Sequence, residues 1–307
     1  MSDQAFDRNA LATRLGTIVG AEHVIRDEPL SAHTTFEVGG PTALFVMPGN
    51  ADELSAVLEA CREAAAPHFV LGCGSDLLVA DKGYPGVIVS LTERLTHMEA
   101  HDNVLVCEAG VSLKNAAAKA CELGLGGLEF ACGIPGSVGG ACFMNAGAYD
   151  GCIADVLQAV DVLLADGSLA TIGVDDLALG YRKSRIADEG MVVISAAFGL
   201  TPTDRPQIQA KMDDLTRRRE EKQPLELPSA GSTFKRPEGY FAGKLISDAG
   251  LKGWRSGGAA VSEKHAGFVV NVGGASAADV HAVIEHVQDE VERQFGVRLQ
   301  PEVRFLG

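Results

Sequence analysis

The chain has 307 residues, with 26 Lys and Arg against 41 Asp and Glu, so its formal charge is 26 − 41 = −15. This acidic balance argues against a nucleic-acid or anionic-membrane partner, because both need a basic surface that displaces counterions. Hydrophobic residues make up 46% and charged residues 22%, which excludes the disordered and fibrous classes. The length of the chain predicts more than one folded domain. No run reaches the ~18 apolar residues of a membrane span. Asp3 and Asp7 stand where a signal peptide would carry positive charge, so we expect a cytoplasmic protein.

The cysteines predict neither disulfides nor a metal site. There are seven, an odd number, and no two of them form a C-x-x-C pair, which suits neither a disulfide framework nor a zinc site. We expect reduced thiols, most of them buried.

The first predicted elements are a helix, a strand, a glycine loop and a second strand. Asn50 caps the helix and Glu53 follows three positions later, with Leu54, Val57, Leu58 and Cys61 at helical spacing. A short apolar strand at residues 69–71 stops at Gly72, and another covers residues 87–89.

The next segment mixes strands with a helix. Residues 104–109 form a predicted strand, and Ser112 then caps a helix that continues to Leu123 and ends at Gly124. Residues 156–164 and 169–172 flank an Ala-Asp-Gly turn and predict a hairpin. This mixture favours an α+β fold over a strict βαβ repeat.

A change in composition marks the last part of the chain. The Pro-containing stretch 201–206 resembles a boundary, and a charged helix follows over residues 207–222 until Pro224 stops it. A helix beginning at Ser276 carries an apolar face that includes Val280, Val287 and Phe295, and a strand is predicted within residues 297–305.

Two glycine-rich segments are the main candidates for ligand contact. The first comprises Leu71, Gly72, Cys73, Gly74, Ser75 and Asp76. Backbone N–H groups of such a loop can converge on a phosphate, although a tight turn is an equal reading and the pattern is not the dinucleotide fingerprint of a Rossmann fold. The second includes Gly133, Pro135, Gly136, Ser137, Gly139 and Gly140. So many glycines are costly in conformational entropy, which favours a ligand that the backbone must approach closely.

Seven motifs in order resemble the UDP-N-acetylenolpyruvoylglucosamine reductase family. They are TTFEVGGP, GCGSDLLVAD, GIPGSVGGACFMNAGAY, GYRKS, SAGSTFK, EKHAGFVVN and the terminal PEVRFLG. Together they extend over nearly the whole chain. The separation of 232 − 182 = 50 positions between Arg182 and Ser232 leaves no room for the tyrosine-bearing loop of one subtype, so the chain resembles the shorter subtype.

The resemblance implies a fold and a cofactor. It implies an α+β FAD-binding domain of the p-cresol methylhydroxylase (PCMH) or vanillyl-alcohol oxidase type, built from two lobes at 1–90 and 91–202, and a substrate-binding domain at 203–307. It also implies non-covalent FAD held by the first loop, the second loop, Ala109, Gly110 and Gly147. Asp76 departs from the family, which more often has Asn there, and a carboxylate beside a pyrophosphate is unfavourable unless it turns away or meets a donor.

The resemblance also implies a reaction and its residues. NADPH is the co-substrate, and the substrate is a nucleotide sugar with an enolpyruvyl group, with no obligate protein partner implied. Ser232 is implied as proton donor, with Arg182 and Glu302 stabilising the enolic intermediate. The implied substrate contacts are Tyr181, Lys222, Lys264, His265 and Asn271.

Three alternatives stay open at this point. Another PCMH-type flavin oxidoreductase would share the glycine loops but would not need GSTFK together with the terminal PEV. A non-catalytic flavin- or nucleotide-binding protein would need neither Ser232 nor Glu302. A nicotinamide dehydrogenase without flavin is disfavoured by the missing Rossmann fingerprint.

Overall fold

The computed structural model describes residues 6–307, which divide into two compact units of interleaved segments. Unit 1 comprises the described residues up to Arg26 together with Ala43–Cys73 and Gly86–Arg218, and unit 2 comprises Asp27–Thr42, Gly74–Pro85 and Arg219–Gly307. The chain therefore crosses from one unit to the other several times. The division into parts 1–90, 91–202 and 203–307 stays a prediction.

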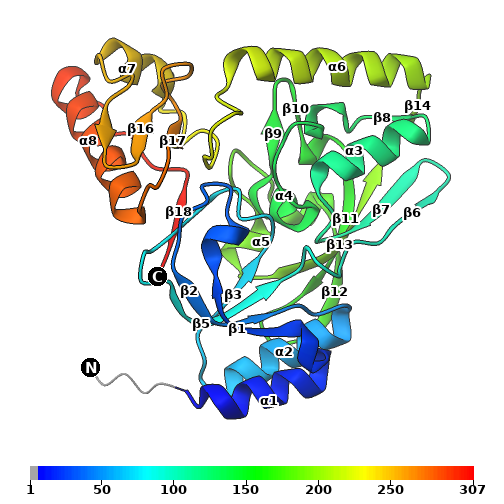
Figure 1. Ribbon diagram of the computed structural model, residues 1–307. Helices are drawn as coiled ribbons and strands as arrows, with labels where there is room; N and C mark the ends of the chain where they lie inside the picture. Colours follow the sequence, from blue (N-terminus) through cyan, green and yellow to red (C-terminus); the bar gives the residue numbers. More distant parts are fainter. Residues whose placement is uncertain (1–5) are drawn as a thin grey trace. The chain divides into compact units, whose positions relative to one another are not determined.

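The first part of unit 1 contains two helices and most of a four-stranded sheet, three of whose strands extend into unit 2. The helices are α1 (Arg8–Val19) and α2 (Ala51–Glu63), which lie side by side (Figure 1). The sheet has the order β1-β2-β5-β3, made of β1 (Val24–Pro29), β2 (Pro41–Val46), β5 (Tyr84–Ser90) and β3 (His68–Leu71). Asn50 accepts the N–H of Glu53 at 2.8 Å, so the predicted cap of α2 is confirmed.

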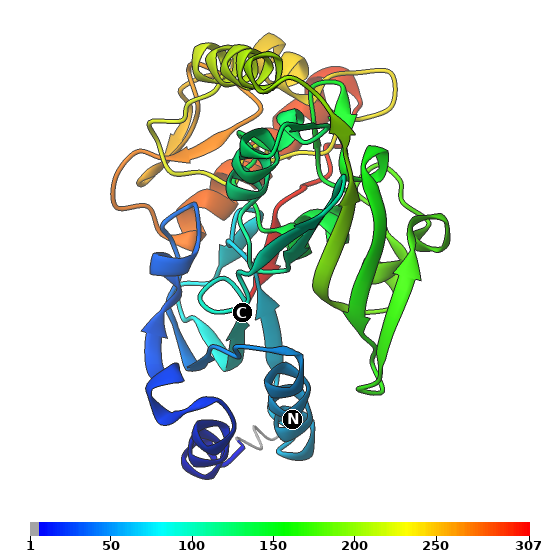
Figure 2. The same ribbon diagram turned by 90° about the vertical axis from the view of Figure 1, so that its right-hand side faces the viewer.

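A five-stranded antiparallel sheet forms the second part of unit 1 (Figure 2). Its order is β12-β11-β13-β7-β6, made of β12 (Leu169–Gly173), β11 (Leu157–Leu163), β13 (Val192–Gly199), β7 (Val104–Glu108) and β6 (Met98–His101). Leu163 pairs with Leu169, which confirms the predicted hairpin.

Helices and short strands complete unit 1. The helices are α3 (Leu113–Glu122), α4 (Val138–Met144), α5 (Arg185–Asp188) and most of α6 (Arg205–Lys222). The short strands are β8 (Leu125–Gly126), β9 (Gly147–Ala148), β10 (Gly151–Cys152) and β14 (Thr201–Pro202). The stretch at 201–206 contains β14, which pairs with β8, and the first residues of α6. Single 3₁₀ turns lie at Ala21–His23, Leu30–His33, Glu129–Ala131, Ile153–Asp155 and Val174–Leu177.

Unit 2 is built around the C-terminal helix. Helix α8 (Ala277–Phe295) packs against a sheet of β15 (Arg255–Ser256), β16 (Ala259–Val261) and β17 (Val269–Asn271), with α7 (Ala242–Asp248) beside it (Figure 1). The helix predicted to begin at Ser276 is confirmed as α8, and the structure adds a capping box of Ser276 and Asp279 at its start. Strand β4 (Leu77–Val79) pairs in parallel with the terminal strand β18 (Arg304–Leu306).

Two details of the C-terminal segment differ from the sequence expectation. Phe295 was expected on the apolar face of the last helix, but it is 38% exposed because it lies in the final turn, after the last buried residue, Val291. The terminal strand covers only three residues. Pro301 precedes it, and proline cannot donate a ladder hydrogen bond.

Each unit has its own hydrophobic core. The core of unit 1 gathers residues of α2, β7, α3, α4 and β13, and that of unit 2 gathers the buried face of α8 with Phe36, Leu78 and Phe234. All seven cysteines are free, and four of them are buried. Burial raises the pKa of Cys107 and of Cys142 to about 12, so both are protonated and unreactive. Between residues 6 and 307, no helix is both long and apolar enough to cross a membrane.

Candidate active site

The two predicted glycine loops meet inside unit 1. A Cβ atom added to Gly72, in the first loop, would lie 2.4 Å from the Oγ atom of Ser137, in the second loop. Only a residue without a side chain fits there. The structure therefore brings together two segments that the sequence placed 65 residues apart (137 − 72 = 65).

The second loop is held by side-chain and backbone hydrogen bonds. Ser137 caps α4 by accepting the N–H of Gly140 at 3.3 Å, and the N–H of Gly139 donates to the carbonyl of Ala109 at 2.9 Å. A Cβ on Gly110 would lie 2.0 Å from the backbone oxygen of Leu91. Gly133, Gly136 and Gly139 remain partly exposed, as does Gly147 in β9, and Pro135 is exposed.

The rest of the first loop belongs to unit 2. Gly74 has a φ of +60°, and a Cβ there would lie 2.0 Å from the carbonyl oxygen of His33. Its own carbonyl accepts the N–H of Thr35 at 3.2 Å. The Oγ1 atom of Thr35 is buried without a hydrogen-bond partner among the described residues. Asp76 accepts the N–H of Arg304 through its backbone oxygen at 3.0 Å, so the chain fixes the backbone of Asp76 at the start of β4.

Arg182 lies in a tight turn of unit 1 with a left-handed backbone. Gly180 and Lys183 exchange backbone hydrogen bonds of 3.0 and 3.3 Å around Tyr181 and Arg182, and Arg182 has a φ of +53°. Such a conformation is strained for a residue with a Cβ and is often found at functional sites. The guanidinium carbon lies 5.3 Å from the centre of the Tyr181 ring. Tyr181 itself is 63% exposed.

Helix α4 joins this turn to the second glycine loop. At its C-terminal end Asn145 donates from Nδ2 to the carbonyl of Gly180 at 3.1 Å. The buried hydroxyl of Ser184 donates to the carbonyl of Phe143 at 2.6 Å and accepts the N–H of Ala187 at 3.1 Å. One short helix thus begins at the glycine loop and orients the turn that carries Arg182.

Ser232 and Glu302 come together in unit 2. The two segments that carry them run alongside each other: the N–H of Glu302 donates to the carbonyl of Thr233 at 2.8 Å, and Phe234 pairs with Pro301. Thr233 is fully buried, and its Oγ1 accepts the N–H of Val269 at 2.9 Å. Ser232 is exposed and directly precedes this rigid residue.

The other predicted substrate contacts also lie in unit 2. Lys222 is the exposed last residue of α6. Asn271 is 7% exposed and uses its amide within the chain, donating to the carbonyl of Phe36 at 3.1 Å and accepting from Gly273 at 2.9 Å. Lys264 donates to the carbonyl of Glu220 at 2.6 Å. The side chains of Asn271 and Lys264 thus both form hydrogen bonds within the chain.

His265 is a neutral, partly buried histidine. Its Nδ1 accepts the N–H of Gly267 at 3.1 Å, which leaves the proton on Nε2 in the neutral ring. Burial lowers the pKa of His265 below its ordinary value. Its ring lies edge-on to Phe268, with centroids 4.9 Å apart.

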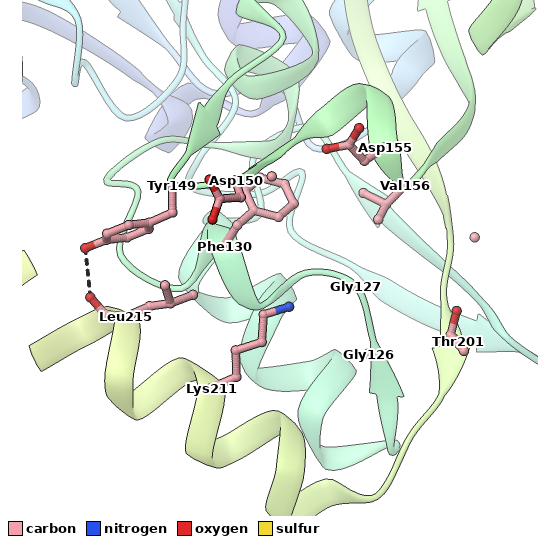
Figure 3. Close-up of a pocket in the computed structure, with 12 residues that line it drawn as sticks. Gly126, Gly127, Phe130, Tyr149, Asp150, Asp155, Val156, Thr201, Lys211 and Leu215 are labelled. Carbon is pink, nitrogen blue, oxygen red and sulfur yellow. Dashed lines mark hydrogen bonds between the residues drawn. The ribbon is translucent and has the colours of Figure 1, made fainter. Parts of the chain in front are cut away.

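A pocket of about 450 Å³ lies elsewhere in unit 1 and contains none of the predicted site residues (Figure 3). Tyr149 reaches across to α6 and donates to the carbonyl of Leu215 at 2.9 Å. Lys211 projects from the same helix and pairs with the buried carboxylate of Glu129 at 3.2 Å. These contacts fasten α6 to unit 1. No cluster of three metal-ligating side chains occurs among residues 6–307.

Several supporting residues were missed by the sequence reasoning. Asn145, Ser184 and Thr233 hold the turn of Arg182 and the segment of Ser232 through the bonds described above. Each lies within or beside a matched motif, which was the only available signal. Their roles depend on partners that are distant in sequence, and local patterns do not reveal such partners.

The glycine segments of each unit fit a flavin cofactor. In unit 1, Gly72, Gly110 and Gly139 stand where a Cβ would lie within 3 Å of a neighbouring atom. Exposed backbone next to such glycines can approach a pyrophosphate. In unit 2, the buried Thr35 hydroxyl offers a hydrogen-bonding group that the described chain does not use. The fold and these segments define an FAD-binding flavoprotein.

Comparisons with known proteins agree with this class and give the family. Residues 42–173 match the model of the FAD binding domain, and residues 223–306 match that of the UDP-N-acetylenolpyruvoylglucosamine reductase, C-terminal domain. A UDP-N-acetylenolpyruvoylglucosamine reductase of Clostridium beijerinckii is 52% identical over 92% of both chains. One of Agathobacter rectalis is 51% identical over 92% of this chain and 94% of its own. The chain belongs to the UDP-N-acetylenolpyruvoylglucosamine reductase family.

Solved structures confirm the α+β, PCMH-type fold. The UDP-N-acetylenolpyruvylglucosamine reductase of Thermus caldophilus matches with a TM-score of 0.79 and 35% identity over 92% of this chain and 98% of its own. p-Cresol methylhydroxylase matches with a TM-score of 0.57 over 93% of this chain and 87% of its own, at 11% identity, which shows the fold alone.

Proposed function

We propose that this protein reduces the enolpyruvyl group of UDP-N-acetylglucosamine enolpyruvate to give UDP-N-acetylmuramate, with FAD as cofactor and NADPH as reductant. The observation that carries the proposal is the 52% identity to a named reductase over 92% of both chains. The product is a precursor of peptidoglycan, so the protein serves cell-wall synthesis and, through it, cell shape and division. We place this activity in the cytoplasm.

Bound FAD supplies hydride chemistry, accepting a hydride from NADPH and delivering one to the substrate. The chain's part is to bind the cofactor and keep its surroundings fixed. Support for that role comes from the fit of Gly72 against Ser137 and from the backbone bonds of the Gly133–Gly140 loop. We expect non-covalent binding, because no residue of the sequence stands out as a flavin attachment site.

Ser232 is proposed as the proton donor. Reduction of the enolpyruvyl double bond places negative charge on the carbon beside the carboxylate, and that carbon then needs a proton. The exposed hydroxyl of Ser232 lies next to the buried and hydrogen-bonded Thr233, so its backbone is held while its side chain is accessible. Because a serine hydroxyl is a weak acid, neighbouring groups in the bound complex must activate it.

Arg182 and Glu302 are proposed to stabilise the enolic intermediate. A guanidinium is permanently charged and can donate two parallel hydrogen bonds to a carboxylate, which suits a charge that develops beside one. The left-handed φ of +53° at Arg182 supports a functional reason for the strained turn. Glu302 is supported by its pairing with the Ser232 segment.

Lys222 and Tyr181 are proposed as substrate contacts. The ammonium of Lys222 forms no hydrogen bond or ion pair with another described residue, so its charge is available to a diphosphate. The neighbouring Gln223 has a buried Oε1 that accepts no hydrogen bond from the described chain. Such an acceptor is costly unless a ligand or solvent donor meets it. Lys264, His265 and Asn271 stay predictions as direct contacts.

A steady-state assay tests the proposed activity. NADPH oxidation by the FAD-loaded protein is expected to depend on UDP-N-acetylglucosamine enolpyruvate, and mass spectrometry is expected to show a product heavier by two hydrogens. The alternative, a PCMH-type oxidoreductase with another substrate, is not favoured by the named relatives. It would gain support if the flavin turned over with a different acceptor and not with this one.

A further inference from the structure

We propose that Lys264 is a positioning residue that completes the C-terminal end of α6 and thereby orients Lys222 toward the nucleotide sugar. The inference rests on the proposed function in one respect, the role of Lys222 as a substrate contact. It differs from the sequence expectation, in which Lys264 itself touches the substrate. All of the residues concerned lie in unit 2.

The end of α6 has a specific defect that Lys264 repairs. In an α-helix the carbonyl of residue i accepts the N–H of residue i+4. For Glu220 that residue is Pro224, which has no N–H. The Nζ atom of Lys264 donates to the Glu220 carbonyl at 2.6 Å. An ammonium from a distant loop thus replaces the donor that proline removes.

The charge of Lys264 suits this position. The C-terminal end of a helix carries partial negative charge, which a cation stabilises. The same ammonium lies 3.8 Å from a carboxylate oxygen of Glu226, whose side chain is 62% exposed. An ion pair this exposed contributes little, so the short bond to the carbonyl is the interaction that matters.

Lys264 is itself held in a preformed turn. The hydroxyl of Ser262, which is 4% exposed, accepts the N–H of Lys264 at 3.2 Å and that of His265 at 3.3 Å. Strand β16 ends immediately before this turn. The backbone of Lys264 is therefore fixed by the sheet of unit 2.

The anchor lies within one helical turn of Lys222. The preceding carbonyl, that of Arg219, accepts a hydrogen bond from the N–H of Gln223 at 2.8 Å. Without Lys264 the Glu220 carbonyl would have no donor from the helix, and the last turn would fray. Since Lys222 is the last helical residue, fraying would move its ammonium first.

The test compares Lys264→Met with Lys264→Arg and with Lys119→Met. Lys119 is a matched control, because its side chain is 39% exposed against 35% for Lys264 and its ion pair with Glu122 is 3.7 Å long. In Lys264→Met we expect KM for UDP-N-acetylglucosamine enolpyruvate to rise roughly ten- to hundredfold, the range for losing a hydrogen bond to a charged group. We expect kcat and flavin reduction by NADPH to stay near those of the parent, Lys264→Arg to recover most of the loss, and Lys119→Met to change nothing.

Two further measurements separate positioning from direct contact. Amide hydrogen exchange at Gln223 is expected to accelerate in Lys264→Met without any substrate present. In the double variant with Lys222→Met, KM is expected to rise no further than in Lys222→Met alone. Additive effects on KM, or unchanged exchange at Gln223, would overturn the proposal. A normal KM in Lys222→Met would instead overturn the substrate role of Lys222, and the exchange measurement distinguishes that failure because it needs no substrate.

Discussion

The backbone N–H of Glu302 donates to the carbonyl oxygen of Thr233 across 2.8 Å, and this bond joins the two segments that carry Ser232 and Glu302. Thr233 is also bonded through its own N–H to Gly267 at 2.9 Å and through its hydroxyl to Val269. The proposed proton donor and one of the proposed charge-stabilising groups therefore belong to one rigid part of unit 2. That arrangement leads to the first prediction.

Replacing Ser232 by Ala separates the two halves of the reaction. Flavin reduction by NADPH is expected to be nearly unchanged, because it needs no proton from Ser232. Reoxidation by the enolpyruvyl substrate is expected to slow ~10²–10⁴-fold, the usual contribution of a positioned acid. Anaerobic stopped-flow absorbance measures both rates, with Ser247→Ala as a control for an exposed serine of the same unit. Equal slowing of the two half-reactions would rule out the assignment.

Replacing Arg182 by glycine is expected to relieve backbone strain and to lower activity. In Arg182→Gly the unfolding free energy is expected to change by less than about 1 kcal/mol, because glycine adopts the left-handed φ without strain and offsets the lost contacts. Flavin reoxidation by the substrate is expected to slow ~10²-fold or more. Urea unfolding and stopped-flow absorbance measure the two effects. A variant that unfolds much more easily and keeps its rate would contradict this account.

The close contact between Gly72 and Ser137 predicts that Gly72→Ala weakens flavin binding and that Ser137→Gly restores it. In Gly72→Ala the new Cβ would lie 2.4 Å from Ser137 Oγ, so the two loops must move apart and FAD retention is expected to fall. Adding Ser137→Gly removes that oxygen at a cost of only a few tenths of a kcal/mol in helix capping. The ratio of visible to ultraviolet absorbance after purification is expected to recover in the double variant.

Gly110 provides the contrast for that experiment. Its added Cβ would lie 2.0 Å from the backbone oxygen of Leu91, which no side-chain change can remove. Gly110→Ala is therefore expected to stay defective when combined with Ser137→Gly. If Ser137→Gly restored neither variant or both, contact between the two loops would not explain flavin retention.

The lowered pKa of Asp279 predicts that the folded protein loses stability in acid. Its carboxylate accepts the N–H of Ser276 at 3.0 Å and that of Gly258 at 3.4 Å. Hydrogen bonds from the Ser276 backbone and side chain, then from the Gly258 backbone, hold the pKa of Asp279 below its ordinary 3.8. Because the folded value is the lower one, the stabilisation is present above pH 3.8 and is lost as pH falls toward the folded pKa.

Urea unfolding of the parent and of Asp279→Asn tests that prediction. The parent is expected to be the more stable of the two near neutral pH, and the difference is expected to shrink only in the acid range below the ordinary pKa of aspartate. A difference that does not vary with pH would mean that the charge of Asp279 contributes nothing to the capping of α8.

Local sequence signals predicted α2, α3, α6, α8 and the hairpin, and they missed α1, α4, α5 and α7. Asn50 and Ser112 cap α2 and α3 as expected, since a capping side chain needs only the N–H groups two or three residues ahead, and α8 begins at the predicted position. The β11–β12 hairpin likewise depends on a short turn. The motif order gave the family, the fold class and the cofactor.

Long-range relationships could not be read from the sequence. The parallel pairing of β4 with β18 and the repeated crossing between the two units involve segments far apart in the chain. Lys264 matched a motif, but its bond to Glu220 depends on a helix end more than 40 residues earlier, at a separation of 264 − 220 = 44. Such pairings depend on tertiary packing, which no local pattern encodes.

The most direct test of the account is an anaerobic titration followed by visible absorbance. One equivalent of NADPH is expected to bleach the flavin of the purified, FAD-loaded protein, and UDP-N-acetylglucosamine enolpyruvate added next is expected to restore the oxidised spectrum with formation of UDP-N-acetylmuramate. A flavin that bleaches and never recovers with this substrate would contradict the proposed function while leaving the fold and the cofactor in place.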